Sequence, residues 1–326
     1  MNFEDALAFF LLALLPLAAL SRQPFDWRPV VALAAIMASV SLIEEGGLFQ
    51  AAASALENKS LALVAPLAYL GGALLTNDAA VLIFAPLVAR AGGGAEEVSA
   101  VAALVNLGSS ITPFGNPQNV LAWISYGLKW QSFLIMVPLT VPAAAYASLK
   151  LKGAKGKAEG YELNVKVAAA GLLSLAASVA LVHAKMYLAA LAASALLSLI
   201  VGRAPKVDLK ALGLLALMIY DFGSVSKMIN VNLGGTLEWM VALIALSQII
   251  SNVPAATVGI SHGAPWLAVL AGSNLGGLGT PVASLANLIA IRATGVDSKE
   301  FSTFNAKLLA LSIIWSVLFI KFLNFK

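Results

Sequence analysis

The sequence predicts an all-α polytopic membrane protein with about nine transmembrane crossings and two re-entrant hairpins, arranged as inverted repeats with two discontinuous helices. Hydrophobic residues make up 60% of the 326 residues and charged residues only 11%, and the mean hydropathy is +0.90. These values lie far outside the range of a soluble globular domain. Long apolar stretches, together with shorter ones that polar residues interrupt, indicate the number and kind of crossings.

Seven apolar stretches approach the roughly 20 residues that the hydrocarbon core requires, so we expect them to cross the membrane as continuous helices. The first follows Glu4 and Asp5 instead of a basic segment, so we interpret it as a retained helix rather than a signal peptide. The expected crossings are 5–20, 28–43, 131–149, 165–183, 186–202, 208–223 and 301–323.

Shorter apolar stretches are joined in pairs by the polar tips TNDAA and SNVPA, which predicts two hairpins. After each hairpin, a polar segment rich in Gly and Pro interrupts a helix. Non-helical backbone at membrane depth must be buried in protein or line a cavity, because lipid cannot hydrogen-bond its N–H and C=O groups. The expected hairpin arms are 62–75 with 79–91 and 237–250 with 254–262, and the expected half-helices are 95–106 with 118–126 and 264–273 with 283–293.

A repeated motif relates the two halves of the chain. NLGSSITPFGNPQNVLA (106–122) aligns without a gap on NLGGLGTPVASLANLIA (274–290), and both share Asn, Gly, Thr-Pro and a second Asn. Upstream, residues 26–43 resemble residues 208–225. The additional crossing 165–183 inverts the second copy relative to the first. Inverted repeats with discontinuous helices are a recurring plan of secondary transporters, whose binding sites lie where the repeats meet.

Lysine and arginine are unevenly divided between the two expected membrane sides, thirteen on the side of the N-terminus and seven on the other. The positive-inside rule then predicts a cytoplasmic N-terminus and an external C-terminus, in the cytoplasmic membrane of a prokaryote. The first hairpin would enter from the cytoplasm and the second from outside. The expected units are residues 1–149 as the first inverted repeat, with hairpin 62–91 and broken helix 95–126, residues 150–164 as a cytoplasmic linker, and residues 165–326 as the extra crossing plus the second inverted repeat, with hairpin 237–262 and broken helix 264–293.

Polar residues at the tips and breaks are candidates for binding ions. Free carbonyl groups coordinate cations, whereas N–H groups at half-helix N-termini favour anions. The tips add hard oxygen ligands suited to Na⁺, and the chain has no Cys to form a thiolate site. The alternative is that these residues only make turns and cap helices. The tip residues are Thr76, Asn77 and Asp78 in the first hairpin and Ser251 and Asn252 in the second.

Asp78 is an acidic residue expected at membrane depth. A carboxylate there costs roughly 2.5–3.5 kcal/mol on insertion scales, so it normally pairs, binds a cation or carries protons. We expect Asp78 to act in ion coupling, and the alternative is a cap on the following hairpin arm. Asp221, His183 and His262 fall near the ends of expected helices, which favours positions at the membrane interface.

The motifs TNDAAVLIFAPLV, NLGSSITPFGNPQN, SNVPA and GSNLGGLGTPVASLANLI resemble the ion transporter superfamily, in particular its branch of arsenite permeases, sodium/proton antiporters and citrate-transporter-like anion permeases. The resemblance covers nearly the whole chain and implies a homodimer in which a transport domain moves as an elevator along a stationary scaffold. In sodium/dicarboxylate relatives, Ser-Asn-Thr at each tip binds sodium and the substrate carboxylate. The matching positions here are Thr76-Asn77-Asp78 and Ser251-Asn252-Val253, so the third hydroxyl is absent from both.

The expected function is therefore secondary active transport of a small anion or oxyacid by an elevator mechanism, coupled to Na⁺ or H⁺ as symport or antiport. The alternative is a cation/proton antiporter without an anion substrate. No enzyme is expected, since the sequence contains no HExxH or paired aspartate motif. The basic residues fall mainly in short loops, so we expect the protein to contact membrane lipid and not to bind nucleic acid. We expect no cofactor beyond the coupling ion.

The tips and breaks supply all the candidate site residues. The expected substrate-binding residues are Asn77, Asn116, Asn119, Asn252, Ser284 and Asn287. The expected cation-binding residues are Thr76, Asn77, Asp78, Asn106, Gly108, Thr112, Gly115, Ser251, Asn252, Asn274, Gly279 and Thr280, with Na⁺ placed at Asn77, Asp78 and Asn252.

The expected topology can be tested by labelling single cysteines in this Cys-free chain. A cysteine at position 155, in the linker, should react with a membrane-impermeant reagent only after the membrane is opened, whereas one at position 326 should react in intact cells. Labelling of position 155 exclusively from outside would reverse the orientation.

Overall fold

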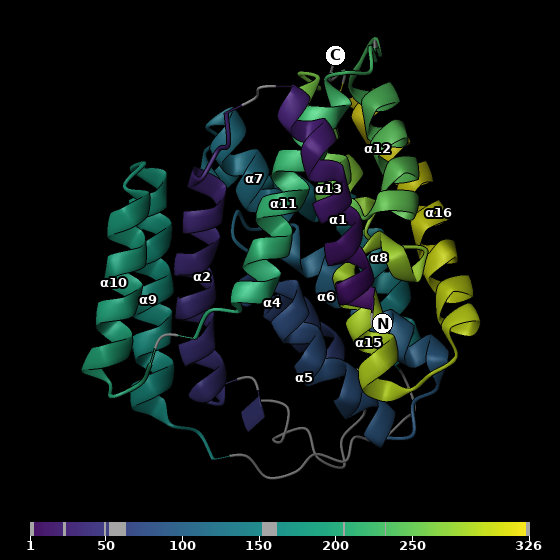
Figure 1. The fold of residues 1–326 in the computed structure, drawn as a ribbon. Coiled ribbons are helices and arrows are strands. Elements are labelled where there is room, and N and C mark those ends of the chain that lie inside the picture. Colours follow the sequence, from purple (N-terminus) through teal and green to yellow (C-terminus); the bar gives the residue numbers. More distant parts are fainter. Residues whose placement is uncertain are drawn as a thin grey trace.

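The chain folds into a bundle of helices, which the computed structural model describes for residues 3–21, 24–48, 50–51, 63–151, 162–204, 206–231 and 233–323. Every regular element within these ranges is a helix (Figure 1). The α-helices are α1 Phe3–Leu20, α2 Arg28–Glu45, α4 Val64–Leu74, α5 Asn77–Arg90, α6 Ala95–Ser109, α7 Pro117–Tyr126, α8 Met136–Lys150, α9 Val165–His183, α10 Tyr187–Ile200, α11 Leu209–Ser226, α12 Thr236–Ile250, α13 Asn252–Ser261, α14 Trp266–Leu275, α15 Leu285–Thr294 and α16 Ser298–Phe322, and the 3-10 helices are η2 Trp130–Ile135 and η3 Pro281–Ala283.

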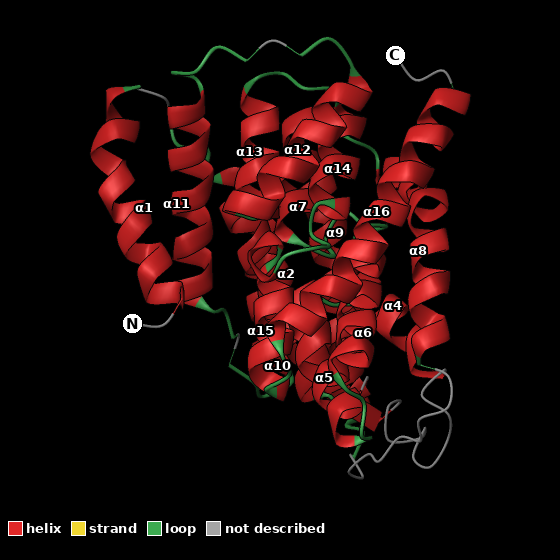
Figure 2. Ribbon diagram, turned by 90° about the vertical axis from the view of Figure 1, so that its right-hand side faces the viewer, coloured by secondary structure: helices red, strands yellow, loops and turns green. Residues whose placement is uncertain are grey.

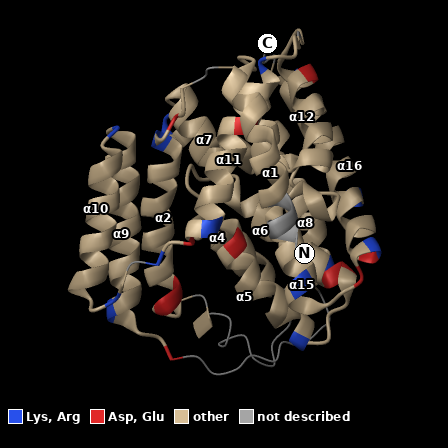
Figure 3. Ribbon diagram, in the orientation of Figure 1, with Lys and Arg blue, Asp and Glu red and all other residues tan. Residues whose placement is uncertain are grey.

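Four helical segments are long and apolar enough to cross a membrane, namely η2 with α8, α9, α11 and α16. The other three expected crossings coincide with α1, α2 and α10, of which α10 has only 14 residues. Most of the charged residues coloured in Figure 3 lie toward the ends of the helices, and a small group lies near the middle of the view, beside α4. The prediction of an all-helical polytopic membrane protein is confirmed at this level.

The expected hairpin arms and half-helices all form separate helices. α4 packs against α5, and α12 packs against α13, as the two hairpins require. The first pair lies in the lower half of Figure 1 and the second pair in the upper half. The two hairpins therefore reach toward the middle of the molecule from opposite ends.

The first helix break begins later than the sequence predicts. α6 continues through Asn106 and Gly108 to Ser109, where the expected half-helix ended at residue 106. The hydroxyls of Ser109 and Ser110 donate to the carbonyls of Asn106 and Leu107 at 2.8 and 2.6 Å, which satisfies backbone groups of the last turn. The break is consequently confined to residues 110–116, between α6 and α7.

Three helices, α2, α9 and α10, pack together as one group. Small residues let α2 and α9 approach closely: a Cβ on Gly171 of α9 would meet the backbone of Ile43. The hydroxyl of Ser39 lies 2.8 Å from that of Ser174. Close backbone approach with hydroxyl bonds between helices is a common way to join helices in lipid, where apolar burial gives no drive for association.

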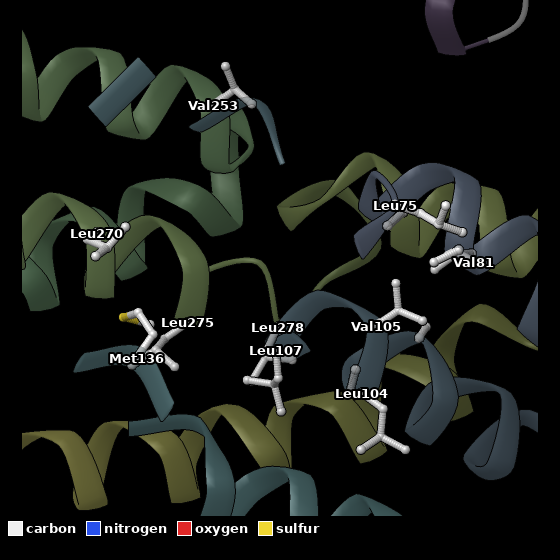
Figure 4. Packing of buried hydrophobic residues seen from close by; sticks show 14 of the residues in the cluster. Leu75, Val81, Leu104, Val105, Leu107, Met136, Val253, Leu270, Leu275 and Leu278 are labelled. Carbon is white, nitrogen blue, oxygen red and sulfur yellow. The ribbon is translucent and has the colours of Figure 1, made fainter. Parts of the chain in front are cut away.

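The central part of the bundle is built around α6 and α14. α6 contacts both arms of the first hairpin and α14 contacts both arms of the second. Buried leucine, valine and alanine side chains from these helices form one continuous cluster, part of which Figure 4 shows around Leu107 and Leu278. This packing connects each hairpin to the broken helix that follows it.

Two helices pack against the opposite half of the chain. α1 packs on α11, and Figure 2 shows this pair at one edge of the bundle. α10 packs on α2. The first helix of each expected repeat therefore covers the second helix of the other.

Replacing Gly72 by Ala should disturb the contact between α4 and α6. The new Cβ would overlap the carbonyl group of Val105, and overpacking of this kind costs about 1–3 kcal/mol. Gly213→Ala in α11 is the matched control, because a Cβ there meets nothing within 4 Å. We expect the purified protein in detergent to unfold several degrees lower with Gly72→Ala and at an unchanged or higher temperature with Gly213→Ala. Equal midpoints for the two variants would contradict this packing.

Candidate functional site

A cavity of about 470 Å³ lies where the two hairpin tips approach the starts of α7 and α15. Asn77 and Asn252, which are half the chain apart in sequence, are 3% and 4% exposed, and both line this cavity. Apolar side chains of α2 and α11, together with Phe10 of α1, form much of the remaining wall. The polar lining residues are Thr76, Asn77, Asp78, Gln118, Asp208, Ser251, Asn252 and Ser284.

Four helices begin at the edge of this cavity. α5 and α13 begin at the hairpin tips, and α7 and α15 begin directly after the helix breaks. The first N–H groups of a helix have no partner within the helix and carry a partial positive charge. Four such ends around one volume favour a negatively charged or strongly accepting ligand.

The first hairpin tip is attached to the first helix break. The backbone N–H of Asn77 donates to the carbonyl of Gly115 at 2.9 Å. The hydroxyl of Thr76 accepts from the N–H of Ala79 at 3.4 Å and so caps α5. Thr76, and not Asp78, therefore supplies the cap on this arm, which removes the structural alternative considered for Asp78.

The second hairpin tip has a different backbone conformation. Ser251 has φ +77° and ψ 160°, whereas the matching Thr76 has φ −76° and ψ 151°. A non-glycine residue in the positive-φ region costs of order 1–3 kcal/mol, and such residues concentrate at binding and switching sites. The two tips are thus related in sequence but not in local geometry.

Buried asparagines connect the two broken helices to each other. Asn106 of α6 donates through Nδ2 to Oδ1 of Asn287 in α15 at 3.0 Å. Asn274 of α14 donates through Nδ2 to Oδ1 of Asn119 in α7 at 2.7 Å. The two bonds occupy equivalent positions of the aligned motifs, and all four side chains are buried.

The residues that begin α7 and α15 reinforce the same connection. Asn116 Nδ2 donates to Oδ1 of Asn274 at 2.8 Å, and the Ser284 hydroxyl donates to Oδ1 of Asn106 at 3.3 Å. Positions 116 and 284 also correspond in the aligned motifs. Asn77 adds the first hairpin to this network by donating to Asn106 Oδ1 at 3.2 Å.

The same asparagines satisfy backbone groups that the breaks leave without helical partners. Asn119 Nδ2 donates to the carbonyl of Thr112 at 2.7 Å, and Asn287 Nδ2 donates to the carbonyl of Thr280 at 3.1 Å. In each case Nδ2 also lies within hydrogen-bonding distance of a second carbonyl, 10 positions upstream of the asparagine. A buried carbonyl without a partner is costly, so these amides stabilise the interrupted backbone.

Threonine side chains attach each break to a hairpin arm. The hydroxyl of Thr112 donates to the carbonyl of Ala73 in α4 at 2.8 Å, and that of Thr280 donates to the carbonyl of Gln248 in α12 at 3.2 Å. Gln248 also donates through Nε2 to two carbonyls of the second break. It packs against Gly279, whose φ of +101° suits glycine. Gln248 was not identified from the sequence, because its position matches Ala73 in the first hairpin and repeats no polar residue.

The structure adds two further polar residues that the sequence analysis did not single out. Gln118 lies in the first turn of α7, and Asp208 is the residue before α11. Both line the cavity beside Asp78. Asp208 matches Asp26 in the repeat, and its place before an apolar helix is typical of a capping residue, but neither observation indicates that it lines a cavity.

Asp221 of α11 is fully buried against neighbouring helices, which the sequence analysis did not predict. Neither of its carboxylate oxygens has a hydrogen-bond partner among the described residues. α1 and α13 pack on α11 and reduce the access of solvent to this helix. The sequence could not show this burial, because it follows from the packing of α1 on the other half of the chain.

The expected site residues fall into two sets. Six of them line the cavity: Thr76, Asn77, Asp78, Ser251, Asn252 and Ser284. The others belong to the surrounding network or to close backbone contacts and do not line it: Asn106, Gly108, Thr112, Gly115, Asn116, Asn119, Asn274, Gly279, Thr280 and Asn287. Among the described residues, no three His, Cys, Asp or Glu side chains form a metal cluster, so an ion in this cavity would rest on amide, hydroxyl and carboxylate oxygens.

Two known proteins are similar to this chain over most of its length, although no family model matches it. The inner membrane protein YbiR of Escherichia coli K12 is 29% identical over 306 residues, which cover 82% of this chain and 80% of YbiR. The uncharacterized transporter MJ0456 of Methanocaldococcus jannaschii is 26% identical over 295 residues, which cover 82% of this chain and 81% of MJ0456. Similarity of this extent includes parts of both halves of the chain.

A double-mutant cycle can test the bond between Asn106 and Asn287. Because the two amides meet at 3.0 Å in a buried position, Asn106→Ala and Asn287→Ala should be coupled by about 0.5–1.5 kcal/mol in unfolding free energy. Thr294→Ala is the control partner for Asn106→Ala, since the Thr294 hydroxyl donates only within α15, to the carbonyl of Ala290. Additive effects in the Asn106/Asn287 cycle would show that the bond is absent.

Proposed function

We propose that this protein is a secondary active transporter that moves a small anion or oxyacid across the membrane, coupled to Na⁺ or H⁺. The observation that carries the proposal is the single cavity at which both hairpin tips and four helix N-termini meet. Helix N-termini stabilise anions without a lysine or arginine, and none lines this cavity among the described residues. The similarity to a protein named as a transporter and to a protein named as an inner membrane protein supports the same conclusion.

The proposal includes two inverted repeats and about nine crossings, with the units at residues 1–149 and 165–326 joined by the linker. Its support is the reciprocal bonding at the centre, in which the end of α6 bonds to α15 and the end of α14 bonds to α7. The two hairpins lie toward opposite ends of the molecule in Figure 1, which supports opposite orientations of the two repeats. Each half-helix break would then lie near the membrane midplane, beside the cavity.

The proposed movement is an elevator. The hairpins and broken helices, α4–α7 and α12–α15, form the moving part, since the asparagine network ties them together across the two repeats. The remaining helices form the scaffold, which in the proposed homodimer supplies the contact between protomers. The cavity reaches the surface at Asp208, where α11 begins. With the N-terminus in the cytoplasm, this opening faces inward.

A second candidate is cation/proton exchange without an anion substrate. The observation that favours it is the presence of two carboxylates, Asp78 and Asp208, in a cavity without a basic lining residue. Counterflow in proteoliposomes separates the two functions. Exchange of arsenite, sulfate, dicarboxylates or citrate supports the anion transporter, whereas Na⁺-dependent proton movement without any of them supports the exchanger.

Asp78→Asn should leave the fold intact and weaken the ion dependence of transport. Thr76 caps α5, so the carboxylate is not required as the cap, and an amide can neither carry a proton nor supply charge to a Na⁺ site. We expect the Na⁺ or H⁺ concentration for half-maximal uptake to change by roughly tenfold or more. Asn77→Ala is the comparison, because it removes a neutral oxygen and keeps the acid. Transport by Asp78→Asn with an unchanged ion dependence would place the coupling site elsewhere.

A further inference from the structure

Asp208 faces the same cavity as Asp78 from a different element. Its Oδ1 accepts from the N–H of Ala211 at 2.9 Å and caps α11, while its side chain remains exposed. Asp78 is the second residue of α5, directly after the first hairpin tip, and both carboxylates line this one cavity. The hairpin and the start of α11 therefore each contribute one carboxylate to the same cavity.

Two buried oxygen atoms of residues that line this cavity lack a hydrogen-bond partner. Oδ1 of Asp78 and Oε1 of Gln118 are inaccessible to solvent and accept no hydrogen bond from the part of the chain that the structure describes. Gln118 is only 3% exposed and lines the cavity. Its Nε2 donates to Oδ1 of Asn274 at 3.4 Å. Buried acceptors are normally satisfied, so two unsatisfied ones at one cavity indicate a ligand that supplies positive charge.

The chemistry of the lining restricts that ligand. Among the described residues, no lysine, arginine or histidine lines the cavity, so no side chain supplies a full positive charge there. A neutral hydrogen-bond donor would leave the charge of Asp78, which has a buried oxygen atom, without a counterion, at a large cost. Carboxylate and amide oxygens are hard ligands that suit an alkali cation.

We propose that Asp208 completes a cation site together with Asp78 and Gln118, and that this site takes Na⁺. The inference rests on the proposed function. It names the coupling ion and adds the start of α11, beside α5 and α7, to the elements that bind it. Asp78 belongs to the moving part and Asp208 to α11 of the scaffold. The cation therefore joins the two parts in this state, and movement of the hairpin away from α11 removes one of its carboxylates.

The test measures binding and needs no knowledge of the substrate. Thermal unfolding of the purified full-length protein is followed while NaCl replaces choline chloride at constant ionic strength. We expect Na⁺ to raise the unfolding midpoint, and Asp208→Asn to raise the half-saturating Na⁺ concentration by roughly tenfold or more. Gln118→Ala, as a second variant, should raise it by a smaller factor, since it removes a neutral ligand.

Asp297→Asn is the matched control. Asp297 is an exposed cap whose Oδ1 accepts from the N–H of Glu300 at 2.8 Å, as Asp208 does for α11, but it does not line the cavity. The Asp297→Asn variant should leave the half-saturating Na⁺ concentration unchanged. Wild-type half-saturation in Asp208→Asn, or no Na⁺ effect on the wild type, overturns the inference. Counterflow in proteoliposomes reports separately on transport, so a failed cation site and a failed transporter are distinguishable.

Discussion

The structure depends on one constraint, which is that backbone polar groups inside a membrane must find partners within the protein. Two interrupted helices expose such groups at the centre of the bundle, and buried asparagine amides satisfy them. Asn119 and Asn287 each donate to a carbonyl of their own break. Asn119 is also bonded to Asn274, and Asn287 to Asn106, in the opposite broken helix. The residues that make irregular backbone tolerable are therefore the same ones that hold the two halves together. A cavity can form beside the breaks because the polar groups behind it are already satisfied.

The two hairpin tips show how related sequences can give unequal sites. Thr76 and Ser251 occupy matching positions, yet only Ser251 adopts a positive φ. Asp78 is matched by Val253, so the charge of the cavity is concentrated on one side. In the proposed function, helix N-termini would hold an anion and carboxylates would hold a cation within the same cavity. The unequal tips would then be the reason that one site can couple two ligands of opposite charge.

Much of this arrangement could be predicted from the sequence, because polar residues within apolar stretches are informative in a membrane protein. The hairpin arms and half-helices were found in this way, and so were the asparagines of the network. The extension of α6 to Ser109 was not, since it depends on hydroxyl bonds by which Ser109 and Ser110 satisfy the last turn. The roles of Asp208 and Gln248 and the burial of Asp221 depend on which helices become neighbours. A single sequence has no local signal for such neighbours.

The packing of α1 on α11 has a consequence for the assembly of the protein in the cell. α1 is made first, but its main contact among the described helices is with a helix that begins at Leu209. Until most of the chain has been inserted, α1 has only lipid to cover a face that later becomes buried. α2 similarly waits for α9 and α10. Insertion of the first half therefore leaves α1 and α2 without their main partners, although α4, α5, α6 and α8 can already pack on one another.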